Sequence, residues 1–285
     1  MATRPPIDNG TVLITGASAG IGRELARQLA PRARTLVLVA RRAERLGALR
    51  AELLAANPEL SVYLAPCDLS DPGAVCAMLE EVLDKVGDID ILVNNAGLGN
   101  QNLYERADWA RVQEIIQVNV LALALLTHRL VGPMVARGRG GILNIGSGAG
   151  LALLPGAAAY VGSKHFVNGF TETLRLELTA TGVAVTQVCP GPVDTEFDQA
   201  AGIEGFDAGP PIPALSAAQC AREALRGFEK GSALVFPGFA YRSLMILLGV
   251  LPRALQRAML RPAARRLRRS SPSSPPSPPP KGDAP

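Results

Sequence analysis

Short apolar runs alternate with helical patterns from the start of the chain. The run Thr11–Thr15 (TVLIT) is continuous in the way expected of a strand buried on both faces. A glycine-rich segment and a helical pattern over Gly20–Leu29 follow it. Parallel strands need crossover connections, which are usually helices, so this alternation predicts an α/β fold with a doubly wound parallel sheet.

The alternation continues through most of the chain and predicts one domain with a mostly parallel seven-stranded sheet flanked by helices on both faces. Further strands are expected at Thr35–Ala40, Ser61–Ala65, Ile89–Val93, Gly141–Ile145, Val183–Cys189 and Ala233–Phe236. Further helices are expected at Ala43–Ala56, Pro72–Val86, Asp108–Ala136, Ala157–Ala180 and Ser216–Phe228. The Gly/Pro-rich segment Thr195–Ala214 is too long for a plain connection and is interpreted as a lid.

Charge divides the chain into two parts. Residues 1–229 carry 19 basic and 24 acidic side chains, whereas residues 230–285 carry 10 basic side chains and one acidic residue, Asp283. The acidic balance of the body disfavours nucleic-acid binding. We therefore expect a domain over 1–237, an apolar and basic helical extension over 238–269, and a disordered Pro/Ser tail over 270–285.

Two interpretations of the extension stay open. Ser243–Leu251 (SLMILLGVL) is far shorter than the ~20 residues of a membrane span, and Pro252 and Pro262 are expected to break the rest of the extension into short helical pieces. The extension is either a peripheral contact with an anionic membrane surface or a cover over the substrate cleft or a subunit interface. We favour the second interpretation.

Cysteine usage and the N-terminal sequence bear on environment. The four cysteines are far apart with no CxxC, and the chain has two histidines, so no metal site is expected. The N-terminal residues contain no apolar signal region, which indicates a cytoplasmic protein, membrane-associated if the extension binds lipid.

The glycine-rich turn after the first strand is a candidate phosphate site. Gly16, Gly20 and Gly22 have the spacing G-x3-G-x-G between a strand and a helix. The helix N-terminus offers free N–H donors, and glycines let a phosphate approach the backbone closely. A tight strand–helix turn alone would also favour glycine. A P-loop is excluded, because no Gly-Lys-Ser/Thr follows.

The end of the second strand bears on which dinucleotide is preferred. NAD-binding folds usually place a carboxylate there, but this strand ends in Ala40 and is followed by Arg41 and Arg42. Guanidinium groups suit a 2′-phosphate, so NADP(H) is favoured over NAD(H). The alternative is that the two arginines begin a solvated helix.

Tyr160 and Lys164 form the third signal. Four residues apart on a helix, the phenol and the ammonium lie on one face. A nearby positive charge lowers the pKa of a tyrosine and makes it a useful acid or base. Ser147, at the end of a strand, is placed to hold a substrate carbonyl beside Tyr160. Alone, a YxxxK pattern is also a common chance occurrence on a helix.

Together these motifs resemble the short-chain dehydrogenase/reductase family, with a Rossmann-type fold, over residues 10–237. They occur in order: TGASAGIG at 15–22, Asn94-Asn-Ala-Gly97, Asn119 in VNV, Ser147, Tyr160 with Lys164, and Pro190-Gly-Pro-Val-Asp-Thr195. The resemblance implies an NAD(P)-dependent oxidoreductase acting on CH–OH or C=O groups, and a homodimer or homotetramer.

The resemblance also implies site roles. Tyr160 is the proton donor or acceptor, Lys164 binds the nicotinamide ribose and lowers the pKa of the tyrosine, Ser147 orients the carbonyl, and Asn119 holds a water in a proton relay. Asp68 contacts the adenine. The positions implied to bind cofactor are Gly16, Ser18, Ala19, Gly20, Ile21, Gly22, Arg41, Arg42, Asp68, Leu69, Asn95, Ala96, Gly97, Tyr160, Lys164, Pro190, Gly191, Val193 and Thr195. Many NADP-preferring members have a basic residue where this chain has Ala19.

Apolar residues surround the predicted site and favour a small apolar substrate over a sugar. They are Leu98, Phe197, Phe206 and the segment 150–154 (GLALL). The leucines are equally explained as core or subunit contacts. The alternative function is a non-catalytic NADP(H)-binding scaffold on the same fold. The presence of Asn119, Ser147, Tyr160 and Lys164 together in one chain disfavours it.

Overall fold

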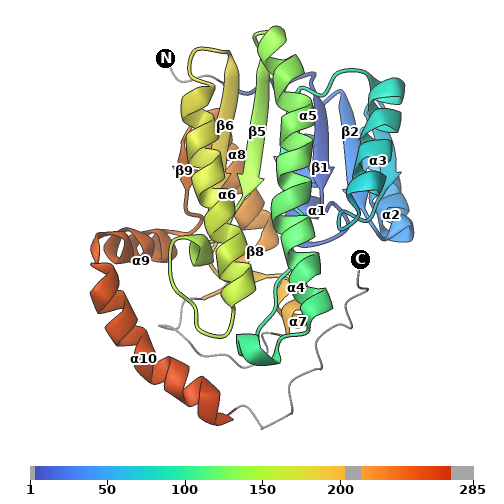
Figure 1. Ribbon diagram of the computed structural model, residues 1–285. Coiled ribbons are helices and arrows are strands. Elements are labelled where there is room, and N and C mark those ends of the chain that lie inside the picture. The colour runs from blue at the N-terminus through green and yellow to red at the C-terminus, as the bar shows by residue number, and fades with distance from the viewer. Residues whose placement is uncertain (1–3, 203–212, 271–285) are drawn as a thin grey trace, which may run out of the picture.

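The computed structural model describes residues 4–202 and 213–270 and contains a parallel seven-stranded sheet (Figure 1). Its order is β3-β2-β1-β4-β5-β6-β9, and each pairing is parallel. The strands are β1 Thr11–Thr15, β2 Thr35–Ala40, β3 Ser61–Pro66, β4 Ile91–Asn94, β5 Gly140–Ile145, β6 Val183–Val188 and β9 Leu234–Val235. The predicted α/β fold with seven strands is confirmed.

Helices cover both faces of the sheet and form a three-layer domain. On one face lie α3 (Pro72–Val86), α5 (Leu123–Ala136) and α6 (Ala158–Glu177), the last two in front in Figure 1. On the other face lie α1 (Gly20–Leu29), α2 (Ala43–Ala56) and α8 (Ala217–Glu229). Strands β1, β2, β5 and β6 are buried along their whole length, which explains why their sequences are continuous apolar runs.

The long helix expected over 108–136 is present and contains a π-helical segment. It consists of α4 (Trp109–Ile116), a π-helical segment η2 (Gln117–Ala122) and α5. Asp108 caps α4 by accepting a hydrogen bond from the Ala110 N–H. The π-helical segment contains Asn119, and such segments frequently occur at functional sites.

The segment interpreted as a lid has local structure that the sequence did not indicate. It contains α7 (Phe197–Ala201), and two short strands flank it, β7 (Val193–Asp194) and β8 (Leu215–Ser216), which pair in parallel. Phe206 lies outside the described residues.

The C-terminal extension consists of two helices, α9 (Phe239–Val250) and α10 (Arg253–Ser270). The helical structure is interrupted at Pro252, between α9 and α10, as expected. The expected interruption at Pro262 is wrong, because α10 continues through this residue. Proline removes one backbone hydrogen bond, and on this largely exposed helix water can satisfy the freed carbonyl. The remaining tail, 271–285, lies outside the described residues.

By length and composition, one described helical stretch, Trp109–Ala136, could cross a membrane, and 44% of its most apolar window is buried. Helices α9 and α10 pass the same test only as a pair, bent by 118° at their junction. The first stretch packs on the sheet as a core helix.

Candidate active site

The predicted site segments meet at the carboxyl edge of the sheet. The glycine turn follows β1, Arg41 follows β2, Asn95 follows β4, Ser147 follows β5 and Pro190 follows β6. The strand order reverses between β1 and β4, which lie side by side. Ligands of open parallel sheets bind at such a switch point, outside the carboxyl ends of the strands.

The glycine turn is packed too tightly for side chains. Gly16 and Gly20 have φ angles of +66° and +52°. A Cβ on Gly22 would lie 2.4 Å from the Asn95 Nδ2, and one on Gly20 would lie 3.0 Å from the Thr195 side chain. The turn therefore brings the segments that follow β4 and β6 against the start of α1.

The N-terminus of α1 is suited to a phosphate. Ala19 at the N-cap gives no side-chain hydrogen bond, and the first turn contains no acidic residue. The first N–H groups of the helix thus lack side-chain acceptors and carry the positive end of the helix dipole. Among the neighbouring predicted positions, Ser18 is 9% exposed, and Ile21 is partly buried against the core.

Hydrogen bonds fix the segment after β4 to the turn. The Thr15 Oγ1 accepts from the backbone N–H groups of Asn95 and Ala96, both at 3.0 Å. The Asn95 Nδ2 donates to the Thr15 carbonyl at 2.9 Å. Hydrogen bonds between side chains and backbone therefore hold this segment against the glycine turn.

Arg42 lies beside the glycine turn. Its Nη2 donates to the Ser18 Oγ at 3.2 Å, and its Nη1 is 3.1 Å from the Glu196 Oε2. Arg45 pairs with the same carboxylate at 2.8 Å. Hydrogen bonds from Arg45 and then Arg42 hold the pKa of Glu196 below its usual value.

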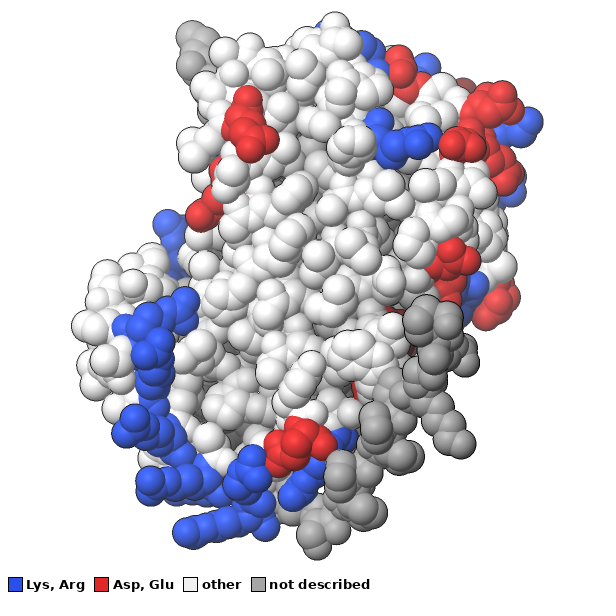
Figure 2. All heavy atoms as spheres, viewed as in Figure 1, with Lys and Arg blue, Asp and Glu red and all other residues white. Residues whose placement is uncertain are grey.

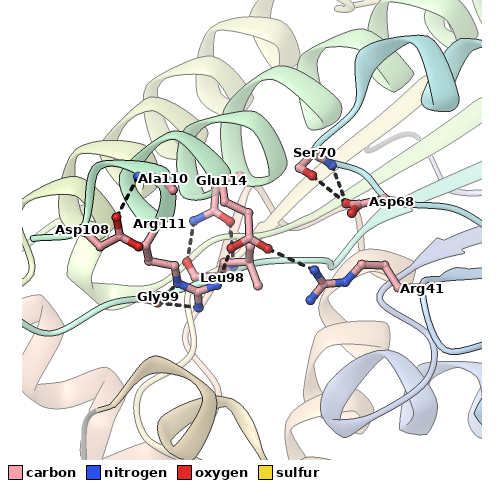
Figure 3. Close-up of polar contacts among 10 residues, drawn as sticks. Arg41, Asp68, Ser70, Leu98, Gly99, Asp108, Ala110, Arg111 and Glu114 are labelled. Atoms are coloured by element: carbon pink, nitrogen blue, oxygen red, sulfur yellow. Dashed lines mark hydrogen bonds and ion pairs between the residues drawn. The ribbon is translucent and has the colours of Figure 1, made fainter. Parts of the chain in front are cut away.

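Arg41 points toward Glu114 on α4 (Figure 3). It pairs with Glu114 at 3.0 Å, and Glu114 also pairs with Arg111 at 2.7 Å. Arg111 in turn donates to the Gly99 carbonyl, so this chain of contacts links β2 to the segment after β4. We call Arg41, Arg42, Arg45, Glu114 and Glu196 the arginine end of the site.

Asp68 lies near Arg41 (Figure 3). It accepts from the backbone N–H of Ser70 at 2.9 Å and from its hydroxyl at 2.7 Å. These two bonds lower the pKa of Asp68, and the Arg41 charge acts in the same direction. The next predicted residue, Leu69, is 7% exposed and belongs to the core.

The predicted quartet, which we call the tyrosine end, is brought together from three elements. Tyr160 and Lys164 come from α6, Ser147 caps the 3-10 turn η3 (Gly148–Gly150) after β5, and Asn119 comes from η2. The Lys164 Nζ donates to the Ile145 carbonyl at 3.0 Å. Burial lowers the pKa of this lysine to about 8.

The predicted lowering of the Tyr160 pKa is wrong, because this pKa is raised. The Lys164 Nζ lies 5.9 Å from the centroid of the tyrosine ring. Burial raises the pKa of Tyr160 to about 12, outweighing a hydrogen bond with Ser147 that lowers it. The phenol is therefore held in its protonated, proton-donating form.

Asn119 connects two walls of the site. Its Oδ1 accepts from the Leu98 N–H at 2.8 Å, and its Nδ2 donates to the Leu98 carbonyl at 2.8 Å and to the Ser163 Oγ at 2.9 Å. A Cβ on Gly97 would lie 3.3 Å from the Lys164 Nζ and 3.5 Å from the Asn119 Oδ1, so these groups surround Gly97 closely. In this geometry the side chain of Asn119 positions its neighbours.

Buried amides place the two site helices on the sheet. The Asn144 Nδ2 on β5 donates to the Thr171 Oγ1 on α6 at 2.9 Å. Asn94 on β4 donates to Asn144 at 2.9 Å and to Thr127 on α5 at 3.1 Å. Because buried polar groups are costly when unpaired, this network specifies how both helices sit.

Aromatic side chains cover the tyrosine end. The Phe197 ring on α7 lies 5.7 Å from the Tyr160 ring, centroid to centroid. Tyr241 on α9 packs on two further site positions, since a Cβ on Gly148 would overlap its hydroxyl and one on Gly191 would lie 2.6 Å from its ring. Leu98 packs against the core, in agreement with the core interpretation.

The remaining predicted positions lie in the segment that follows β6. Pro190 accepts a hydrogen bond from the Gly148 N–H at 3.0 Å, Val193 is in β7, and Thr195 contacts Gly20. Sequence reasoning missed Arg45, Glu114, Glu196 and Tyr241. Arg45 belongs to the basic run RRAER, but the other three lie far from their partners in sequence and have no local signal.

A comparison with protein families is decisive. A model of the family described as short chain dehydrogenase matches residues 10–204. The chain belongs to the short-chain dehydrogenase family. This family member is thus an oxidoreductase acting on CH–OH or C=O groups, and the resemblance seen in its motifs is confirmed.

Curated relatives of this short-chain dehydrogenase include reductases. Sulfoacetaldehyde reductase 2 of Chromohalobacter salexigens is 40% identical over 192 residues, which cover 65% of this chain and 73% of the relative. Dehydrogenase/reductase SDR family member 7 of Homo sapiens is 37% identical over 189 residues, which cover 65% of this chain and 56% of the relative.

Solved structures of the family have the same fold. A short-chain dehydrogenase from Sphingobium yanoikuyae in complex with NADPH is 30% identical, has a TM-score of 0.74, and covers 94% of this chain and 98% of its own. The bulky-bulky ketone specific alcohol dehydrogenase from Comamonas testosteroni is 26% identical with a TM-score of 0.71, covering 86% and 96%.

Proposed function

We propose that this short-chain dehydrogenase uses NADP(H) to interconvert a small apolar ketone or aldehyde and its alcohol, with Tyr160 as the proton donor or acceptor. The observation that carries the proposal is the enclosure of the Tyr160 phenol against the Ser147 hydroxyl, with the Lys164 ammonium nearby. These are the groups that a carbonyl oxygen needs when it gains or loses a proton.

The residues at the start of α1 and at the arginine end fit a nicotinamide dinucleotide. The uncapped N-terminus of α1 suits the pyrophosphate, and Arg42 beside Ser18 suits a 2′-phosphate. When bound, the cofactor supplies or accepts the hydride. Preference for NADP(H) is supported by Arg41 and Arg42 at the end of β2, where no carboxylate follows directly in sequence.

The residues at the tyrosine end perform the proton transfer. In the reducing direction, hydride adds to the carbonyl carbon and the Tyr160 hydroxyl gives its proton to the carbonyl oxygen. The raised pKa of Tyr160 keeps this proton in place at neutral pH. Ser147 orients the carbonyl, and Lys164, whose pKa of about 8 keeps it mostly charged at pH 7, binds the nicotinamide ribose and stabilises negative charge on the phenol oxygen. In the oxidising direction the proton returns to Tyr160.

An apolar substrate is supported by what surrounds Tyr160. Phe197 covers its ring from α7, and Tyr241 and Met245 on α9 pack beside Gly148. Phe197 thus offers aromatic surface beside the Tyr160 ring, and Tyr241 and Met245 offer apolar surface beside the loop that carries Ser147. A sugar would require several polar partners in the same place.

An assay of NADPH oxidation with matched carbonyl panels tests this function. Aryl-alkyl ketones and medium-chain aldehydes should be reduced faster than ketoses at equal concentration. Stopped-flow traces with 4R- and 4S-deuterated NADPH should show a primary isotope effect for one of them. Faster reduction of ketoses would overturn the substrate class, and no NADPH consumption with any carbonyl would overturn the reductase function.

We further propose a homodimer or homotetramer formed through α5 and α6. Figure 2 shows the face over these helices largely free of charged side chains. Exposed apolar residues there include Leu121, Val135, Phe166 and Leu176. Such a patch is typical of a subunit interface. Light scattering should show a dimer or larger that Phe166→Glu/Leu176→Glu converts to a monomer. A monomeric wild-type chain would contradict the assignment.

A further inference from the structure

Helix α9 is apolar on two opposite faces. Its inward face carries Tyr241 and Met245, which are buried and pack on Gly148 and Gly191. Gly148 directly follows Ser147, so α9 is fixed over the loops that carry the tyrosine end. A helix that is hydrophobic all round is normally covered on every side.

The outward face of α9 is not covered by any described part of the chain. Phe239, Ile246, Leu247 and Val250 are 88%, 56%, 58% and 74% exposed. At helical spacing these four side chains lie on one face, opposite Tyr241 and Met245. An exposed apolar patch of this kind marks an interaction surface.

Helix α10 carries a ridge of positive charge. Arginines recur every four residues at 253, 257, 261, 265 and 269, all exposed, and the helix contains no acidic residue. Within the described ranges 4–202 and 213–270, no carboxylate forms an ion pair with these five arginines; the helix has a salt bridge at Arg268, with Glu105 at 3.0 Å. Like charges four residues apart on a helix repel each other and destabilise it. An anionic partner would relieve this repulsion.

The two surfaces lie together. Helices α9 and α10 meet at a bend of 118°, and the basic side chains gather along this corner of the molecule at the lower left of Figure 2. Leu267 contacts the segment that follows η3, since a Cβ on Gly156 would lie 2.6 Å from its Cδ2. The far end of α10 is thus held against the domain, beside the loops of the tyrosine end.

We propose that the elbow formed by α9 and α10 docks on an anionic lipid surface. The outward side chains of α9 enter the boundary between head groups and acyl chains, and the α10 arginines contact lipid phosphates. A nucleic acid or an acidic peptide would satisfy the arginines but would leave the apolar face of α9 without a partner. An exposed apolar face next to a row of arginines is what interfacial helices present to anionic bilayers.

A second copy of this chain fits the elbow less well. Two arginine ridges brought together would repel each other, and the uncharged face over α5 and α6 already offers a surface for a second copy. Docking would also place the loops beside Ser147 at the bilayer, where apolar carbonyl compounds concentrate. This last consequence rests on the proposed function, whereas the docking itself does not.

Vesicle co-sedimentation of the full chain tests the proposal. Phosphatidylcholine vesicles with and without phosphatidylserine are compared at low and high salt. The protein should sediment with the phosphatidylserine vesicles at low salt and be released by high salt, because the charge interaction is screened. No binding to phosphatidylserine vesicles, or equal binding to both vesicle types, would overturn the proposal.

Matched variants locate the surface. Arg257→Gln/Arg261→Gln/Arg265→Gln should weaken binding by about a hundredfold, since each basic residue near an anionic surface contributes about fivefold. The control Arg50→Gln/Arg222→Gln/Arg226→Gln removes the same charge from exposed arginines on α2 and α8 and should bind like wild type. Equal loss in both triple variants would reject the ridge as the docking surface.

A third variant separates lipid from a second copy. Ile246→Ser/Leu247→Ser/Val250→Ser should lower vesicle binding by about tenfold or more and leave the oligomeric state by light scattering unchanged. Conversion of a dimer to a monomer by this variant would assign the face to a subunit interface instead. NADPH binding, titrated for every variant, shows whether a failed docking test leaves the proposed reductase function intact.

Discussion

The tyrosine end and the arginine end of the site differ in how far their side chains are buried and in what these side chains bind. At the tyrosine end, Lys164 is 5% exposed and Asn119 is 1% exposed, and both bind backbone carbonyls. At the arginine end, the side chains of Arg41 and Arg42 are 56% and 41% exposed and bind carboxylates of other elements. Burial therefore determines the pKa values of the side chains at the tyrosine end. At the arginine end, exposed ion pairs that a ligand can replace hold the side chains in place.

The difference predicts how each end responds to change. A buried group fixed by backbone contacts has no substitute when it is removed. An exposed ion pair in water is worth little, and a ligand phosphate can take the place of its carboxylate. Substitutions at the tyrosine end should therefore have larger effects than substitutions at the arginine end.

Tyr160→Phe should reduce turnover by about a thousandfold or more, because it removes the proton donor and keeps the ring. NADPH affinity should stay within about twofold of wild type, because the Tyr160 hydroxyl is hydrogen-bonded with Ser147 and not with the glycine turn. Steady-state rates and calorimetry on the same preparation measure both. Turnover close to wild type would reject Tyr160 as the proton donor and favour a binding role for the fold.

Lys164→Met should change how stability depends on pH. The pKa of Lys164 is about 8 in the folded protein, against 10.5 for a free side chain. Between these values the folded state has already lost the proton that the unfolded state still binds, so the free energy of unfolding of wild type rises with pH.

Relative to Lys164→Met, the free energy of unfolding of the wild type should thus rise by up to about 3 kcal/mol between pH 8 and pH 10.5. This gain is lost as the pH falls from 10.5 to 8, and below pH 8 the difference between the two proteins should stay constant. Urea unfolding of both proteins across this range measures the difference. Parallel stability curves would show that the lysine is not held in a desolvating site.

Arg42→Gln should weaken NADPH binding by about tenfold or more, as expected for the loss of a charge-assisted hydrogen bond to a 2′-phosphate. NADH binding should not change. Arg50→Gln is the matched control, because Arg50 is an exposed arginine within α2, the helix that Arg42 precedes, and within the described part of the chain it forms no hydrogen bond to Ser18. Equal weakening of both cofactors would place Arg42 at the pyrophosphate or assign it a structural role.

Glu196→Gln should have the smallest effect and the opposite sign. It frees Arg42 and Arg45 from a carboxylate that a 2′-phosphate must displace, so NADPH should bind about threefold tighter with NADH unchanged. Calorimetric titration of both cofactors measures it. Weaker NADPH binding in this variant would show that Glu196 orients the arginines for the phosphate rather than competing with it.

Sequence reasoning reached the fold and the tyrosine end for a physical reason. Strands buried on both faces must be continuous apolar runs, and helix–strand alternation then leaves few topologies. In parallel strands the carboxyl ends share one edge, so residues that follow different strands, such as Gly16, Asn95 and Ser147, had to meet.

The features that sequence reasoning missed depend on contacts between distant segments. The π-helical turn around Asn119 and the pairing of β7 with β8 are decided by packing of the whole domain, as is the contact of Tyr241 with Gly148. The predicted direction of the Tyr160 pKa was wrong because desolvation, the largest cause of its shift, is a property of the whole enclosure and cannot be read from the i, i+4 spacing of Tyr160 and Lys164. Glu196 and Glu114 were missed for the same reason, since their partners lie on other elements.

The most direct test of the central claim is calorimetric titration of the full-length protein with NADPH and, separately, with NADH. NADPH should bind tighter by about tenfold or more, because Arg42 and Ser18 lie together beside the uncapped N-terminus of α1. Equal affinity or tighter NADH binding would contradict the assignment of the arginine end to a 2′-phosphate. Failure to bind either cofactor would contradict the oxidoreductase function itself.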